Sequence, residues 1–559
     1  MKHIIRLILA SHLFALSHTS ADTIPPDENF KVDTLVEGLQ DPMEFAVHSS
    51  GKVFIAERKG ALKLYDPDTK KTTVVKQFDV STRGTKKRKS NNRESGLLGI
   101  ALDPAFDTNN WIYVYYSPDA QDYHVLSRFD YTKGKLTKEK QVLKVPRHVG
   151  NDVCHEAGCI EFGPDGLLYL STGDNTNPFV SNGYSPADER EDRAWADAQR
   201  TAANTNDLRG KILRIKPTID GGYTIPENNL FKVGTEKTKP EIYIMGCRNP
   251  YRMSIDPKTN YLYWGKVGPD AKDNSDRGPK GYDEINQAKQ AGNYGWPYFS
   301  GDNQPYAKYD FADNEIGALQ DASKPINNSP NNTGLDILPP AQPAFQTLPR
   351  GCNAAGQVYY ADMYPESKDK FPAELDSTLF TYNWNNGKFT AVKISEEGKV
   401  EWSKPIFDKH RLVKPNDIEF AVDGSLYVLE YGNEWYNGSD GKVKRIAYTK
   451  ELIKLKEINE DPRLAGLPID HTGTTLIGGS TCLACHQVDA KSIGPSYTQI
   501  AQKYKTKKDA AIYLAQKIIN GSQGVWGEQP MPPNAQFNKE QASQIADAIL
   551  DAKSTKHKK

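Results

Sequence analysis

Close to the C-terminal end of the 559-residue chain, "GSTCLACHQVDA" places Cys482, Cys485 and His486 in a C-x-x-C-H pattern. Two thiols at this spacing can bond a porphyrin covalently while the histidine that follows ligates its iron. The same thiols can chelate zinc or form a redox disulfide, but zinc would need a second Cys/His pair downstream, and the sequence has none. The pattern therefore predicts a covalently bound haem c.

A sixth ligand for the haem iron is expected farther along the chain. Met531 lies in "GVWGEQPMPPN", where flanking prolines stiffen the backbone and would fix the position of the sulfur. The alternative reading is a methionine packed in a core. Axial ligation by His486 and Met531 would raise the haem potential and fill both axial positions, which favours electron transfer over oxygen binding.

Three helices must hold these ligands. "SYTQIAQKYK", "DAAIYLAQKIIN" and "KEQASQIADAILDA" place apolar residues three and four apart, which predicts a small all-α domain over residues 474–553. The segment, with "IGPSY" and "GSQGVWGEQPMPP", resembles the class I bacterial cytochromes c. Residues 449–473 are interpreted as a linker and residues 554–559 as a basic tail.

The preceding 22–448 segment has a different pattern, in which a turn is followed by a strand-like run with an aliphatic-aromatic pair. Six such pairs predict six similar β-units, as in a six-bladed β-propeller, with a sandwich or barrel as the alternative. The all-β reading also suits the high glycine, proline and tyrosine counts of 43, 35 and 29. The pairs are Val53-Phe54, Ile112-Tyr113, Leu168-Tyr169, Leu262-Tyr263, Leu379-Phe380 and Leu426-Tyr427.

The charge balance and the first residues bear on location and partners. Lys plus Arg and Asp plus Glu number 71 each, which provides no global field for nucleic acid or an anionic membrane. Residues 1–21 have the basic start, apolar run and small-residue end of a secretory signal peptide. The apolar run is too short to span a bilayer, which needs ~20 residues. We therefore expect a periplasmic or secreted protein.

A cytochrome fused to a larger domain is expected to receive electrons from chemistry in that domain. The sequence has no G-x-G-x-x-G between a strand and a helix, so it gives no case for NAD or FAD bound in the Rossmann manner. Several segments instead resemble the soluble quinoprotein glucose/sorbosone dehydrogenase family, in which a six-bladed propeller binds pyrroloquinoline quinone (PQQ) and calcium. They are "GLQDPMEFAVHSSGKVFIAERKGALKLYD", "ESGLLGIALDPAF", "HEAGCIEFGPDGLLYLSTGD", "LRGKILRI", "GCRNPYRMSIDP", "GYDEINQAKQAGNYGWPY" and "NDIEFAVDGSLYVLEYG".

This resemblance implies roles for individual residues. His155 stands where the family has the general base, which must accept a hydroxyl proton near neutral pH. Asp174 matches the carboxylate that orients this histidine, and Arg248 and Asn249 match residues that contact PQQ. Glu94 matches a position where an acid or amide contacts substrate. Without the resemblance, the plainer readings are a structural histidine, a turn with a surface ion pair and a solvated loop acid.

The resemblance also implies two calcium sites. The backbone carbonyls of Gly268 and Pro269 match those that hold the calcium of the cofactor. Asp283 and Glu284, with the carbonyl of Tyr294, match a second, structural site, although Asp283 can instead accept bonds from neighbouring N–H groups.

Other positions depart from the family. Asn385 stands where a cofactor-binding lysine is expected, and Lys414 and Asn416 replace two arginines, so Lys414 is the remaining charged anchor expected to contact PQQ. Cys154, Cys159, Cys247 and Cys352 are read either as two disulfides, with Cys154–Cys159 and Cys247–Cys352 as one pairing, or as free buried thiols.

These observations predict an exported PQQ-dependent sugar or polyol dehydrogenase that passes electrons through haem c to a respiratory acceptor, such as another cytochrome or a copper protein. A tether between the two domains would keep the local concentration of haem high. The alternatives are a calcium-dependent, lactonase-like propeller hydrolase and a non-catalytic carbohydrate-binding propeller carrying a cytochrome.

Overall fold

The computed structural model describes residues 24–82, 94–365, 367–436, 438–449, 461–468 and 472–555. The expected signal peptide, most of the expected linker and the last four residues of the basic tail lie outside the described residues. The chain divides into two compact units: the larger contains Lys31–Ala447, and the smaller contains Tyr448–Lys559 together with Glu28–Phe30. Among the described residues, no helix has both the length and the apolar character needed to cross a membrane.

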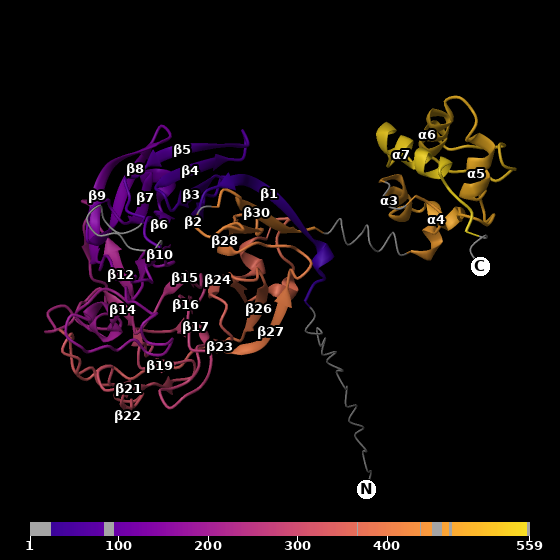
Figure 1. The fold of residues 1–559 in the computed structure, drawn as a ribbon. Coiled ribbons are helices and arrows are strands. Elements are labelled where there is room, and N and C mark those ends of the chain that lie inside the picture. The colour runs from indigo at the N-terminus through magenta and orange to yellow at the C-terminus, as the bar shows by residue number, and fades with distance from the viewer. Residues whose placement is uncertain are drawn as a thin grey trace, which may run out of the picture. The chain divides into compact units, whose positions relative to one another are not determined.

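The larger unit is a six-bladed β-propeller, as predicted. The blades are antiparallel sheets, apart from a short parallel pair between β14 and β18 in blade three. The first strands of successive blades contact one another in a closed ring. In Figure 1 these six first strands surround the centre of the unit. They are β2 (Pro42–Val47), β6 (Leu97–Leu102), β10 (Ala157–Phe162), β15 (Pro250–Ile255), β24 (Asn353–Tyr359) and β28 (Pro415–Phe420).

The outer strands complete the blades in order. Blade one continues with β3 (Val53–Glu57), β4 (Ala61–Asp66) and β5 (Lys71–Gln77), and blade two with β7 (Trp111–Tyr116), β8 (Tyr123–Thr132) and β9 (Lys135–Pro146). Blade three adds β11 (Leu168–Thr172), β12 (Lys211–Pro217) and β14 (Ile242–Met245), with the short β13 (Tyr223–Thr224) and β18 (Gly292–Asn293). Blade four adds β16 (Leu262–Lys266), β17 (Asp283–Ala288) and β23 (Gln346–Leu348). Blade five adds β25 (Thr378–Asn383), β26 (Phe389–Ile394) and β27 (Val400–Ile406).

The last blade closes the ring with strands from both ends of the propeller. Its strands β29 (Leu426–Glu430) and β30 (Gly441–Tyr448) are followed in the sheet by β1 (Phe30–Leu39). Because β1 pairs with β30, the N-terminal strand of the propeller belongs to its last blade. Backbone hydrogen bonds between these strands hold the two ends of the propeller together. Smaller elements lie in the connections: α1 (Phe106–Asn109), β19 (Phe299–Ser300), β20 (Gln304–Pro305), β21 (Ala307–Tyr309) and β22 (Ile316–Leu319).

The repeated aliphatic-aromatic pairs explain why the blades form. Every pair lies in the second strand of its blade, in β3, β7, β11, β16, β25 and β29. All twelve side chains are buried, because β-branched, aliphatic and aromatic residues fill the space between neighbouring sheets. The sequence repeat is therefore a packing repeat.

The smaller unit is helical, as predicted, and packs around one apolar core. Its helices are α3 (Thr472–Gly478), α4 (Cys482–Cys485), α5 (Tyr497–Tyr504), α6 (Ala510–Asn520) and α7 (Lys539–Leu550). Helices α5 and α7 both begin with a capping box, at Ser496 and Asn538, in which side chains satisfy the first free backbone N–H groups.

Helix α3 was not expected, because the sequence analysis placed its first residues in the linker. Threonine and glycine are weak helix formers, so local propensity does not reveal it. Tertiary packing decides instead: a Cβ atom on Gly473 would lie 2.0 Å from the Gln544 carbonyl of α7, so only glycine allows this close approach. The helix also buries Ile477 in the core of the small unit.

Candidate functional site

A cavity of about 250 Å³ lies in the propeller and is lined mainly by residues at the beginning of the first strands of the blades. His155 precedes β10, Asn249 precedes β15, Asn353 begins β24 and Asn416 lies at the start of β28. The ring arrangement brings these distant segments together at one end of the strands. Loop residues from the blade connections complete the walls.

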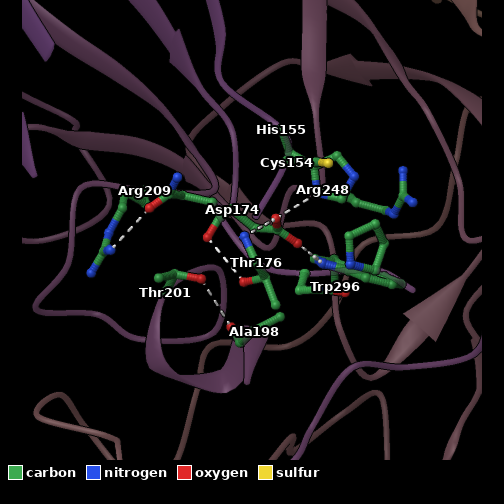
Figure 2. A network of polar contacts seen from close by, with 12 residues as sticks. Cys154, His155, Asp174, Thr176, Ala198, Thr201, Arg209, Arg248 and Trp296 are labelled. Atoms are coloured by element: carbon green, nitrogen blue, oxygen red, sulfur yellow. Dashed lines mark hydrogen bonds and ion pairs between the residues drawn. The ribbon is translucent and has the colours of Figure 1, made fainter. Parts of the chain in front are cut away.

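His155 and Asp174 form the centre of the site (Figure 2). His155 Nδ1 lies 2.7 Å from Asp174 Oδ1, and Asp174 has no exposure to solvent. The carboxylate also accepts hydrogen bonds from the Thr176 N–H at 3.1 Å and from Trp296 Nε1 at 2.7 Å. With Nδ1 bonded to Asp174, the imidazole presents Nε2 as its second nitrogen for proton transfer.

The backbone at His155 is held in an unusual conformation. Its φ of 69° lies in the left-handed region, which is costly for a residue with a side chain and is often found at functional sites. Glu94 holds this conformation, because its Oε2 accepts the N–H groups of His155 at 2.7 Å and of Glu156 at 3.1 Å. Burial raises the pKa of Glu94 above its ordinary value. Glu94 lines the cavity and also anchors the loop that carries the histidine.

Arg248 is fixed beside this pair. Its Nη1 donates to the Val267 carbonyl at 3.3 Å, and its Nη2 lies 3.2 Å from Asp270 Oδ2. The Arg248 carbonyl accepts the Asp174 N–H at 2.8 Å, so the arginine and the buried carboxylate are tied through the backbone as well. The Arg248 side chain is buried and lines the cavity.

Two polar atoms at the cavity have no hydrogen-bond partner among the described residues. They are Asn249 Oδ1 and Arg58 Nε, and both side chains line the cavity. Buried polar atoms are normally paired, so unpaired ones in a cavity wall indicate a place where a bound molecule would complete the bonding. Asn249 was predicted from the sequence, whereas Arg58 was not.

Trp296 is a second residue that the sequence analysis did not assign. Its indole N–H donates to Asp174, and the Arg248 guanidinium lies 5.9 Å from its ring centroid. The residue lies within the family-like segment "GYDEINQAKQAGNYGWPY", which is the signal that points to it. Arg58 likewise lies in the family-like first segment, at "FIAER".

An aromatic wall of the cavity is formed by Trp384, Tyr431, Trp435 and Tyr436, which are linked by ring contacts, and Phe179 also lines the cavity. Trp384 and Trp435 pack edge to face with ring centroids 4.8 Å apart. Phe179 and Trp435 remain 66% and 52% exposed, which is unusual for large apolar side chains beside a cavity. Such a surface suits a ligand with an apolar face.

At the three positions where the family's cofactor-binding residues are replaced, the structure shows other contacts or no place in the cavity wall. Lys414 Nζ donates to the Asn433 carbonyl at 2.8 Å, and Lys414 is not among the residues that line the cavity. Asn416 lines the cavity, but its amide donates to the carbonyls of Pro42 and Met43 at 2.9 and 2.7 Å. Trp384, rather than Asn385, lines the cavity on this side.

The two expected calcium sites have different surroundings. Gly268 and Pro269 lie between Val267 and Asp270, which both line the cavity, so their backbone runs beside it. At the second site, Glu284 Oε2 lies 2.7 Å from Lys266 Nζ, which also donates to the Tyr294 carbonyl at 3.2 Å. Asp283 accepts bonds from N–H groups, as its alternative reading proposed. The oxygens expected to hold a second calcium are thus already bonded to a lysine and to amides.

The four propeller cysteines are free thiols in the structure. The disulfide interpretation is therefore wrong, and the alternative of free thiols holds. Cys159 and Cys247 lie in one buried apolar cluster of the propeller. Cys154 and Cys352 line the cavity.

The smaller unit contains a second cavity, of about 130 Å³, lined by Cys482, Cys485, His486 and Met531 together with apolar side chains. His486 Nδ1 lies 2.7 Å from the Pro495 carbonyl, which assigns its proton to Nδ1 and leaves Nε2 as a ligand. Met531 is held by two backbone hydrogen bonds with Ser522, at 2.7 and 3.0 Å. The thiols, imidazole and thioether predicted from the sequence therefore surround one apolar cavity, which fits a covalently bound haem.

The comparisons with known proteins agree with the division of the chain into a propeller and a helical unit. Residues 39–436 match the family model of glucose/sorbosone dehydrogenases, and residues 471–552 match that of cytochrome c. The chain is 25% identical over 437 residues to quinoprotein glucose dehydrogenase B of Acinetobacter calcoaceticus, covering 72% of this chain and 85% of that protein.

Two further similarities concern the separate units. The C-terminal region is 53% identical over 74 residues to cytochrome c-552 of Nitrosomonas europaea, covering 13% of this chain and 72% of that protein. The fold resembles a putative oxidoreductase (glucose dehydrogenase) from Thermus thermophilus, with a TM-score of 0.52 at 23% identity, covering 75% of this chain and 99% of that one. The chain is an oxidoreductase that belongs to the glucose/sorbosone dehydrogenase family and carries a C-terminal cytochrome c domain.

Proposed function

We propose that the protein oxidises a sugar or polyol with PQQ bound in the propeller cavity and passes the electrons to haem c. The observation that carries this proposal is the His155–Asp174 pair, in which a solvent-excluded carboxylate holds a cavity-lining imidazole by Nδ1 at 2.7 Å. An alcohol can be oxidised by hydride transfer only if its hydroxyl proton is also removed, and an imidazole suits that task near neutral pH.

The cavity residues fit a planar, anionic quinone. Arg58 and Arg248 supply two guanidinium groups, and Asn249 Oδ1 and Arg58 Nε are the unpaired polar atoms of the wall. Carboxylates pair well with guanidinium groups, and the aromatic wall suits a flat ring system. The charge of Arg58 is already paired with the buried Asp41, whose Oδ2 lies 2.9 Å from Arg58 Nη2, so Arg58 would act through a hydrogen bond of its Nε. The Gly268 and Pro269 carbonyls would offer oxygen ligands to a calcium ion bound with the quinone.

Each side chain then has a defined task. The quinone supplies an acceptor for the hydride that leaves the substrate carbon. His155 Nε2 takes the hydroxyl proton from that same carbinol, so the alcohol becomes a carbonyl group. Asp174 stabilises the imidazolium that forms, and Trp296 and Thr176 keep the carboxylate in place. Arg248 would orient the acceptor and stabilise the negative charge that develops on it.

The aromatic wall supports a cyclic sugar as the substrate. A pyranose ring has an apolar C–H face that packs on an aromatic ring, while its hydroxyl groups remain free for polar contacts. The exposed position of Trp435 and Phe179 at the cavity favours a ligand that extends toward solvent, such as an oligosaccharide.

The cavity of the helical unit supports the proposed transfer of electrons through haem c. A haem held by Cys482, Cys485, His486 and Met531 supplies a one-electron carrier of raised potential. Its acceptor would be a respiratory cytochrome or copper protein. Attachment of haem c also agrees with export, which the first 21 residues predict.

Sequencing of the exported protein is expected to give Asp22 as its first residue; retention of Met1 would contradict export by cleavage.

The central test is reduction of the haem by substrate. We expect aldoses to change the haem absorbance of the full-length protein once PQQ and calcium are added. Lactone hydrolysis without haem reduction would favour the hydrolase, and sugar binding without either reaction would favour the binding module.

Asp174→Asn is expected to lower kcat for this reduction by about 10²- to 10⁴-fold, because an amide can no longer stabilise the imidazolium. Asp165→Asn is the matched control, since Asp165 is an exposed turn residue of the same blade. Stopped-flow absorbance of the haem measures both. Unchanged turnover in Asp174→Asn would exclude the proposed proton transfer.

Trp435→Ala is expected to raise KM by about 2- to 10-fold with little change in kcat, because the ring contributes binding that is equal in the ground and transition states. Trp402, in the outermost strand of blade five, provides the control variant Trp402→Ala. Steady-state kinetics with a series of mono- and disaccharides would separate the two parameters. An equal effect of both variants would count against a sugar subsite at the wall.

Met531→Ala is expected to lower the haem midpoint potential, because the thioether ligand that raises it is lost. Met363→Ala, in an exposed part of the propeller, is the control. Redox titration followed by visible absorbance measures both potentials. The idea of Met531 as an axial ligand fails if the spectrum and potential remain those of the unmodified protein.

A further inference from the structure

A buried lysine occupies the place where the family resemblance predicts a second calcium ion. Lys266 ends β16, and Glu284 lies directly opposite it on β17. Lys266 Nζ is 2.7 Å from Glu284 Oε2 and 3.2 Å from the Tyr294 carbonyl oxygen. Both charged residues are only 2% exposed. The ammonium group therefore joins two of the three residues expected to bind the metal.

The third expected ligand, Asp283, is saturated with amide donors. Its Oδ1 accepts the Gly268 N–H at 3.0 Å. Its Oδ2 accepts the N–H groups of Gly351 and Asn353 at 3.0 and 2.9 Å, and the Asn353 side-chain amide at 3.0 Å. A carboxylate with four such bonds is already compensated in its buried position.

The number and charge of the donors suit an ammonium better than calcium. Calcium takes six to eight oxygen ligands, whereas an ammonium group has three donors and a single positive charge. Glu284 completes its own bonding with the Gly301 N–H at 2.8 Å and the Asn286 amide at 3.0 Å. A calcium ion here would also meet the like charge of Lys266 in a buried environment. In the described part of the chain, no group of three His, Cys, Asp or Glu side chains could hold a metal ion.

We propose that the Lys266 ammonium replaces a structural calcium ion, so that this part of the propeller holds its shape without a divalent cation. Its position connects it to the active site. Lys266 is followed by Val267, whose carbonyl accepts Arg248 Nη1, and then by Gly268. Lys266 is accordingly a positioning residue for Arg248. The inference does not depend on the proposed function, because its test needs neither quinone nor substrate.

The test is calorimetric unfolding of the full-length, haem-loaded protein prepared without quinone. The unfolding temperature of the propeller is expected to be unchanged by a calcium chelator or by added calcium. Lys266→Ala is expected to lower it by about 5 °C or more, because Glu284 is left as an unpaired buried charge. Added calcium should then raise it again, since Glu284, the Tyr294 carbonyl and the unpaired Asn286 Oδ1 remain as oxygen ligands.

Two further variants make the result specific. Lys258→Ala removes a half-exposed lysine that pairs with Asp362, and it should show no response to calcium. The double variant Lys266→Ala/Glu284→Gln should lose the calcium response, which excludes calcium bound at the cofactor site as its cause. Should Lys266→Ala not fold, its refolding yield with and without calcium gives the same information, and equal yields contradict the proposal.

Two outcomes overturn the proposal. One is a chelator-induced fall in the unfolding temperature of the unmodified protein that Glu284→Gln abolishes, because calcium would then bind beside Lys266. The other is a Lys266→Ala variant that folds but does not respond to calcium.

Discussion

The proposed active site depends on keeping the charge of Asp174 inside the protein. A carboxylate without access to water is tolerated only when donors surround it, and here the donors are His155, Trp296 and the Thr176 N–H. They come from separate parts of blade three and from the connection that follows β18. Satisfying one buried charge therefore fixes the position of the imidazole and the indole together. The Asp174 N–H adds the backbone of Arg248 to the same unit.

Two buried lysines of the propeller are compensated in the opposite way, by oxygen acceptors. Lys211 is fully buried and donates to the carbonyls of Thr201, Ala202 and Arg209 at 2.7, 3.1 and 2.7 Å. Burial lowers its pKa to about 7. Lys266 has a carboxylate and a carbonyl as its partners. Lys211 gathers three backbone oxygens as a bound cation would, whereas Lys266 combines one backbone oxygen with the Glu284 carboxylate.

In the proposed function, the two units separate the two kinds of electron chemistry. In the propeller, the cavity combines a proton acceptor, guanidinium groups and aromatic rings, which suits a two-electron oxidation of an alcohol. In the helical unit, His486 is aligned by the Pro495 carbonyl inside an apolar cavity, which suits a carrier of single electrons. Each unit has its own apolar core.

Local patterns in the sequence, together with the family-like segments, predicted the propeller, and the C-x-x-C-H spacing predicted residues that line one cavity of the helical unit. The aliphatic-aromatic pairs predicted the blades because they mark the second strand of each one, and Cys482, Cys485, His486 and Met531 share one cavity as their spacing indicated. His155 and Asp174 were identified only through family-like segments, since nothing in their spacing requires a contact. The tertiary structure alone decided the rest. It revealed α3, the contact of Trp296 with Asp174, the position of Arg58 in the cavity wall, the contact of Lys414 with Asn433 and the placement of Lys266 between Glu284 and Tyr294. Each of these depends on contacts between residues far apart in the chain, which periodicity and local spacing do not encode.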